Sequence, residues 1–150
     1  MLTDHASDLQ LSTEDFAETP RRKEAALHNP SVLAQIDTIV ENRGIFRAEA
    51  YTFVLDSLEL VLQQIGERRH ITGEELLEGI KDHARERFGP MAKDVLNAWG
   101  VHNTLDFGRV VFHLVEAGIL KRKPEDSLSD FIDKYDFTEA FEVGYFENQL

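Results

Sequence analysis

Apolar residues recur at intervals of three and four throughout residues 71–120, the spacing that places side chains on one face of an α-helix. Thr72 and Glu75 fit a capping box, in which the side chain of each accepts a hydrogen bond from the backbone N–H of the other. A helix is therefore expected to begin there. Three glycines interrupt the pattern where helices end: Gly89, Gly100 and Gly118. Three helices are predicted: 73–88, 90–99 and 104–117, the last capped by Asn103 or Thr104.

Gly79 and Gly108 lie inside two of these predicted helices. Glycine in a helix interior costs about 1 kcal/mol relative to alanine. Close approach of another helix at each glycine is the simplest compensation, so both positions predict tight packing.

Two more helices are predicted upstream. Pro30 and Ser31 open the first, which ends before Gly44. The second runs from about Arg47 to Ile65, and its broad apolar stripe suits the centre of a helical bundle.

The chain after Gly118 admits two interpretations. Residues 119–123 could form a strand that turns at residues 124–126 into a hairpin. Alternatively, Ser127 caps a short helix that continues to Tyr135 with apolar residues at helical spacing. The spacing favours the helix.

The predicted fold is all-α, a compact single-domain bundle of about five helices. Residues 71–120 have the helix order of a winged-helix core, with a short hairpin or helix after it. Residues 1–30 are expected to be a flexible polar tail, 31–143 the helical domain, and 144–150 a frayed end.

Composition narrows the functional classes. The sequence has 150 residues and no cysteine, which excludes disulfides, thiol nucleophiles and cysteine-ligated metals, and a reducing cytoplasm is the expected location. No apolar run approaches the ~20 residues that a membrane span requires, and no signal peptide is expected at the N-terminus. The formal net charge is −12, which disfavours binding to nucleic acids and to anionic membranes.

Basic residues in and after the third helix of 71–120 form one candidate surface. In a winged helix-turn-helix, Asn103, Thr104, Arg109 and His113 would face outward from the reading helix. The wing would carry three further cations: Lys121, Arg122 and Lys123. The simpler interpretation is that these residues are solvated edges of a helical core.

A second candidate surface precedes the capping box. Arg68, Arg69 and His70 lead into the helix start at Thr72, where unpaired N–H groups and the helix dipole attract anions. The alternative is that the basic residues bind the last carbonyls of the preceding helix.

No catalytic residue, metal ligand or cofactor is predicted. Six histidines are present, but they form no metal-binding spacing such as HExxH. His83 lies near several acidic residues, and His113 lies three residues before Glu116. Ordinary surface pairing in an acidic helical protein accounts for both.

A resemblance covers most of the chain, from about residue 44 to 141. Five segments carry it: AEAYTFVLDSLE (48–59), RRHITGEELLEGI (68–80), FGPMAKDVLNAWG (88–100), TLDFGRVVFHLVEAGIL (104–120) and YDFTEAF (135–141). They resemble a small bacterial protein family that has no established function. The resemblance implies a small soluble bacterial protein and supplies no catalytic residue, ligand or partner.

The expected role is a non-enzymatic cytoplasmic adaptor or regulatory module that contacts an unidentified protein partner and no membrane. The alternative is a winged-helix-like nucleic-acid-binding or transcription-regulatory domain that uses the cations of 109–123. The third hypothesis is a binder of small anions, or an enzyme, that uses Arg68, Arg69 and His70.

Overall fold

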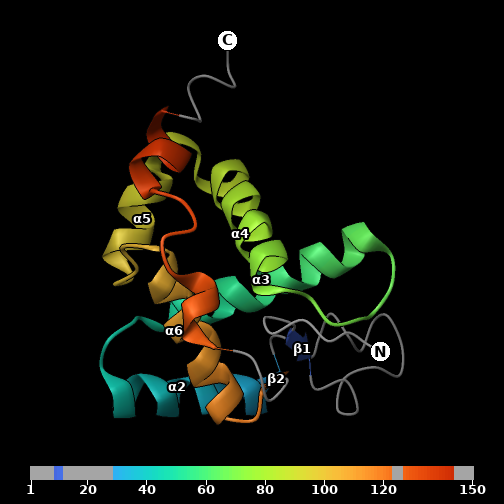
Figure 1. The fold of residues 1–150 in the computed structure, drawn as a ribbon. Helices are drawn as coiled ribbons and strands as arrows, with labels where there is room; N and C mark the ends of the chain where they lie inside the picture. Colours follow the sequence, from blue (N-terminus) through green and yellow to red (C-terminus); the bar gives the residue numbers. More distant parts are fainter. Residues whose placement is uncertain (1–8, 12–28, 123–126, 144–150) are drawn as a thin grey trace.

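Most of the helices begin or end at a capping residue that the sequence supplies. The computed structural model describes residues 9–11, 29–122 and 127–143 (Figure 1). Within these residues it contains five α-helices: α2 (Pro30–Arg43), α3 (Ala48–Ile65), α4 (Gly73–Phe88), α5 (Ala92–Ala98) and α6 (Thr104–Glu116). The predicted all-α, single-domain architecture is confirmed.

Side-chain caps fix the starts of α4 and α6. The Thr72 hydroxyl accepts a hydrogen bond from Glu75 N at 3.0 Å, and the Glu75 carboxylate accepts one from Thr72 N at 2.9 Å. This is the predicted capping box. Of the two residues proposed to cap α6, Asn103 does so, because its side chain accepts a hydrogen bond from Asp106 N at 2.9 Å.

The end of α6 is a Schellman motif. Ile119 N donates to Leu114 O, and Gly118 N donates to Val115 O, each at 3.0 Å. The motif requires a left-handed residue, and Gly118 supplies it with φ of 82°.

Helix α3 lies at the centre of the bundle, and α2, α4 and α6 all pack against it (Figure 1). The predicted close approach of another helix is confirmed at Gly79, whereas at Gly108 the close neighbour is the side chain of Phe131 on a single 3₁₀ turn. A Cβ on Gly79 would lie 2.2 Å from Cγ2 of Val61 on α3, and a Cβ on Gly108 would lie 2.7 Å from the ring of Phe131. Glycine at each position therefore lets another element reach the helix backbone.

The segment after α6 combines the two predicted interpretations. Strand β2 (Leu120–Arg122) forms, and Ser127 caps the single turn of 3₁₀-helix η3 (Leu128–Phe131). The partner of β2 is β1 (Leu9–Leu11), which pairs with it antiparallel, Leu11 opposite Leu120. The predicted return strand of the hairpin is therefore replaced by a segment from the start of the chain.

Residues 131–141 close one side of the core. The Thr104 hydroxyl, fully buried at the start of α6, donates to Phe131 O at 2.6 Å and accepts from Lys134 N at 3.1 Å. Phe137 and Phe141 are also buried, the latter in the short helix η4 (Thr138–Val143), which lies beside α5. This segment therefore belongs to the core.

Several predictions concern residues outside the described part of the chain. The expected tail of 1–30 lies outside it except for residues 9–11 and 29–30. The turn at 124–126, Lys123 and the expected frayed end at 144–150 also lie outside it.

Candidate functional site

The start of α4 is the region predicted to attract anions. The carboxylate of Glu75 already lies there, bound to Thr72 N through the capping box. Arg69 donates to the same carboxylate, with Nη2 at 2.9 Å from Oε2. The hydrogen bond from Arg69 is the main reason that the pKa of Glu75 lies below its ordinary value. The chain's own carboxylate thus takes the position that a bound anion would take.

Arg68 points to a different element from its neighbour. Its Nη1 lies 3.1 Å from both carboxylate oxygens of Glu59 on α3, and both side chains are mostly buried. A hollow of about 250 Å³ beside Arg68 is also lined by Glu59 and Glu67. His70 is half-buried between the two helices that flank it. Of the four residues predicted as one anion site, Arg68 therefore binds Glu59, whereas Arg69 and Thr72 bind Glu75.

The residues predicted to read nucleic acid are only partly exposed. Thr104, expected to face outward, is fully buried, because its hydroxyl bonds to the 131–134 segment. Within α6 the two largely exposed residues are Arg109 and Glu116, one of each charge. Arg109 is paired with Asp106 on the same helix, with Nη1 2.6 Å from Oδ1. Helix α6 packs against α3 and η3, so little of its surface remains for a groove of DNA.

The proposed wing also differs from the prediction. Lys121 and Arg122 are exposed on β2, but the strand pairs with β1. The guanidinium of Arg122 lies 5.3 Å from the ring centre of Phe112 on α6, as a cation–π contact. Lys123 is outside the described residues.

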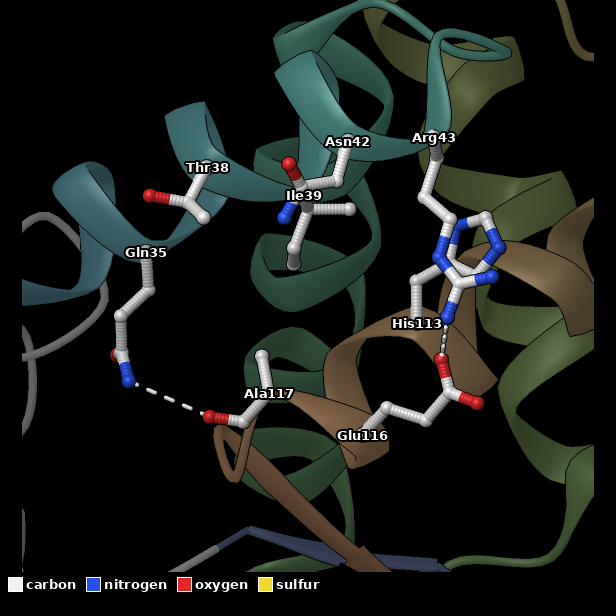
Figure 2. Close-up of a pocket in the computed structure, with 8 residues that line it drawn as sticks. All are labelled: Gln35, Thr38, Ile39, Asn42, Arg43, His113, Glu116 and Ala117. Atoms are coloured by element: carbon white, nitrogen blue, oxygen red, sulfur yellow. Dashed lines mark hydrogen bonds and ion pairs between the residues drawn. The ribbon is translucent and has the colours of Figure 1, made fainter.

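An open pocket of about 340 Å³ lies between α2 and α6 (Figure 2). Arg43 on α2 forms an ion pair with Glu116 on α6 across it. The Gln35 amide donates to Ala117 O at 3.3 Å. Other residues complete the lining: Thr38, Ile39, Asn42 and His113. Its cation and its carboxylate neutralise each other, so the pocket has no net electrostatic preference.

His113 also lines this pocket, and its ring forms a hydrogen bond with a residue of the core. Its Nδ1 lies 2.8 Å from the hydroxyl of Tyr51, which is fully buried on α3. Burial, with a smaller contribution from Arg43, lowers the pKa of His113, and burial raises the pKa of Tyr51 to about 12. Tyr51 therefore keeps its proton. Because a fully buried hydroxyl needs an acceptor, we assign it as the donor of a hydrogen bond to the neutral imidazole. His113 is a structural acceptor here rather than an outward-facing reader.

His83 repeats this arrangement on α4. Its Nδ1 lies 2.8 Å from the hydroxyl of Ser57 on α3, and its ring stacks on Phe53 with ring centres 4.4 Å apart. Burial lowers its pKa. A serine–histidine pair can form a nucleophile, but Ser57 is fully buried, so no substrate can reach its oxygen. The contact fastens α4 to α3.

Helices α3 and α4 diverge from the point where they cross (Figure 1). A groove of about 450 Å³ lies between their side chains. Apolar side chains of α3, Val61 and Ile65, line it together with Gly79 of α4. Polar residues complete the lining: Gln64, Glu74, Glu75, Glu78 and Asp82. In the sequence, Glu74, Glu78 and Asp82 recur at helical spacing and form the polar face of the predicted helix 73–88. The sequence did not show which part of α3 lies beside them, because helical spacing carries no information about contacts between helices.

The two histidine–hydroxyl pairs and the Arg68–Glu59 pair were also not predicted. Tyr51 and Ser57 lie on the apolar stripe of a buried helix, where each hydroxyl needs a hydrogen-bond partner. This requirement was the feature of the sequence that pointed to a partner for each. Within residues 9–11, 29–122 and 127–143, no group of three or more His, Asp or Glu side chains could hold a metal ion. No helix in that part of the chain is long and apolar enough to cross a membrane.

Comparison with known proteins gives no relative: no family model, no curated protein and no solved structure matches the chain. The resemblance to a bacterial family therefore stays a prediction.

Proposed function

We propose that this protein is a non-enzymatic cytoplasmic adaptor or regulatory module that acts by binding another protein. One observation supports it above the others. The side chains best suited to chemistry or anion binding are bonded to groups of the chain itself: His83 to Ser57, His113 to Tyr51, Arg68 to Glu59 and Arg69 to Glu75. The histidine bonds join α4 and α6 to α3, and the arginine bonds hold the linker between α3 and α4 to those two helices. These side chains are therefore occupied within the chain, and recognition is left to the remaining surface of the helices.

Binding of nucleic acid is the second candidate. The adjacent exposed cations Lys121 and Arg122 favour it. Protein–DNA affinity depends on several lysine or arginine contacts to phosphates, and here the net charge is −12. Two exposed cations on an acidic protein therefore support nucleic-acid binding less strongly than the internal bonds support a protein partner.

Affinity capture of the tagged protein from its native cell extract, with and without nuclease, distinguishes these functions. An adaptor retains one stoichiometric protein after nuclease treatment. A nucleic-acid binder loses its captured material with nuclease, and also when Lys121 and Arg122 are changed to Glu. An empty eluate contradicts both and directs attention to small ligands of Arg68, Arg69 and His70.

A further inference from the structure

Three carboxylates on α4 form a row beside the α3–α4 groove. Glu74, Glu78 and Asp82 are separated by four residues each, and all three are exposed. Residues four apart lie on one face of a helix with a rise of about 6 Å, so the row is about 12 Å long. A row of this length matches cationic groups repeated along a chain better than it matches a single small amine.

An apolar strip runs beside this row. Ile65 is half-buried in the groove, and Val61 contacts the α4 backbone at Gly79. The groove therefore offers apolar contact on its α3 side and negative charge on its α4 side.

The charges of the row are only partly neutralised by the protein. Lys81 lies 3.1 Å from Glu78, whose side chain is 62% exposed. Within residues 9–11, 29–122 and 127–143, no ion pair involves Glu74 or Asp82. The lining contains no cationic side chain.

We infer that the α3–α4 groove is the partner-binding surface of this protein. Its occupant is a basic amphipathic segment of another protein, with lysine or arginine on one side and apolar residues on the other. In a helical segment, cations at every fourth residue repeat at about 6 Å, the same spacing as the carboxylates of α4. The apolar side of such a segment packs against Ile65, beside Val61, as in helix-in-groove recognition. This inference rests on the proposed function and names the chemistry of the partner.

A synthetic helical peptide of leucine, alanine and lysine, with lysine at every fourth position, is the probe. Titration is followed by fluorescence anisotropy and by changes in the backbone amide NMR spectrum. The test variant carries Glu78→Gln and Asp82→Asn. The matched control carries Asp37→Asn and Glu41→Gln, because these exposed residues of α2 have the same spacing and the same charges.

The groove predicts NMR shifts confined to residues 60–65 and 74–82. It also predicts a Kd about tenfold higher for the test variant and within about twofold of wild type for the control. Ile65→Ser tests the apolar side, and raises the Kd without changing charge, whereas Leu33→Ser on α2 does not. Equal losses in the test and control charge variants would show diffuse attraction to an acidic protein and overturn the inference.

The two proposals fail in different ways. If the wild-type protein captures no stoichiometric protein from its cell extract, the adaptor function is wrong. If it does, and the Glu78→Gln, Asp82→Asn variant captures the same protein equally well, only the groove is wrong.

Discussion

The hydroxyl of Tyr51 and Nδ1 of His113 are hydrogen-bonded at 2.8 Å across the junction of α3 and α6. Burial keeps the tyrosine protonated and the imidazole neutral, since it raises the pKa of one to about 12 and lowers that of the other. With the hydroxyl as donor, the histidine is the tautomer that carries its proton on Nε2. Two helices are joined by a contact whose strength depends on protonation.

Replacing Tyr51 by Phe removes the donor and keeps the ring. We expect the free energy of unfolding to fall by about 1 kcal/mol, because Nδ1 of His113 loses its partner in a half-buried position. Urea denaturation measures the loss, and the ¹⁵N shifts of the His113 ring should change from the Nε2–H tautomer to a mixture. Unchanged ring shifts in Tyr51→Phe would contradict the assigned bond.

Stability should decrease in mildly acidic solution through His83 and His113. Burial lowers the folded-state pKa of both, His83 also facing Arg87, Asp56 and Glu86, and His113 facing Arg43, Glu116 and Arg109. The unfolded chain, with a histidine pKa near ~6.5, then binds more protons than the folded chain as the pH falls. The contribution of the two histidines to the free energy of unfolding is therefore complete above about pH 6.5. It is lost as the pH falls from there through their lower folded-state pKa values.

Urea denaturation across this pH range provides the measurement. The double variant His83→Gln, His113→Gln should show a smaller decrease in the free energy of unfolding between neutral and mildly acidic pH. His102→Gln, at an exposed position, serves as the control. An undiminished slope in the double variant would assign the pH dependence to other groups.

A different acid transition should depend on Arg69. Its hydrogen bond lowers the pKa of Glu75 below the ordinary value of 4.5. The capping carboxylate therefore adds stability that is present above that value and is lost as the pH falls through the lower folded-state pKa. Arg69→Gln should raise the pKa of Glu75, which NMR titration of its carboxyl carbon reports directly. A pKa that stays unchanged in Arg69→Gln would show that the cap alone holds the carboxylate.

Gly79→Ala should destabilise the protein although alanine favours helices. The new Cβ would lie 2.2 Å from Cγ2 of Val61, so the Val61 side chain must leave its rotamer or the two helices must shift. Overpacking costs about 1–3 kcal/mol, and a contact this short lies at the upper end of that range. The helix propensity of alanine returns ~1 kcal/mol, so we expect a net loss of about 1–2 kcal/mol. Thermal and urea denaturation measure it. Adding Val61→Ala should recover part of the loss, and a Gly79→Ala protein as stable as wild type would refute the close approach.

The features predicted correctly from sequence are those determined by neighbours along the chain. The capping box of Thr72 and Glu75 and the Schellman end at Gly118 involve residues within five positions of each other. Both therefore follow from short patterns. The tight packing at Gly79 could also be predicted, because glycine destabilises a helix interior and close packing against it compensates for that cost.

The candidate sites were predicted less well because they depend on distant partners. Thr104 was expected at the surface, but Phe131, 27 positions away, accepts its hydrogen bond. Arg68 and Arg69 are adjacent and looked like one cluster, yet Arg68 binds Glu59 on α3 and Arg69 binds Glu75 on α4. Sequence spacing does not reveal which carboxylate lies opposite each cation.

The packing of residues 131–141 against α4, α5 and α6 has a consequence for biosynthesis. A chain leaves the ribosome from its N-terminus, at about 5–20 residues per second. When α6 emerges, its buried face around Gly108 still lacks the ring of Phe131 that fills it. The nascent chain therefore exposes an incomplete core until residues 131–141 emerge. A chaperone that binds apolar surface can bind the chain in that interval.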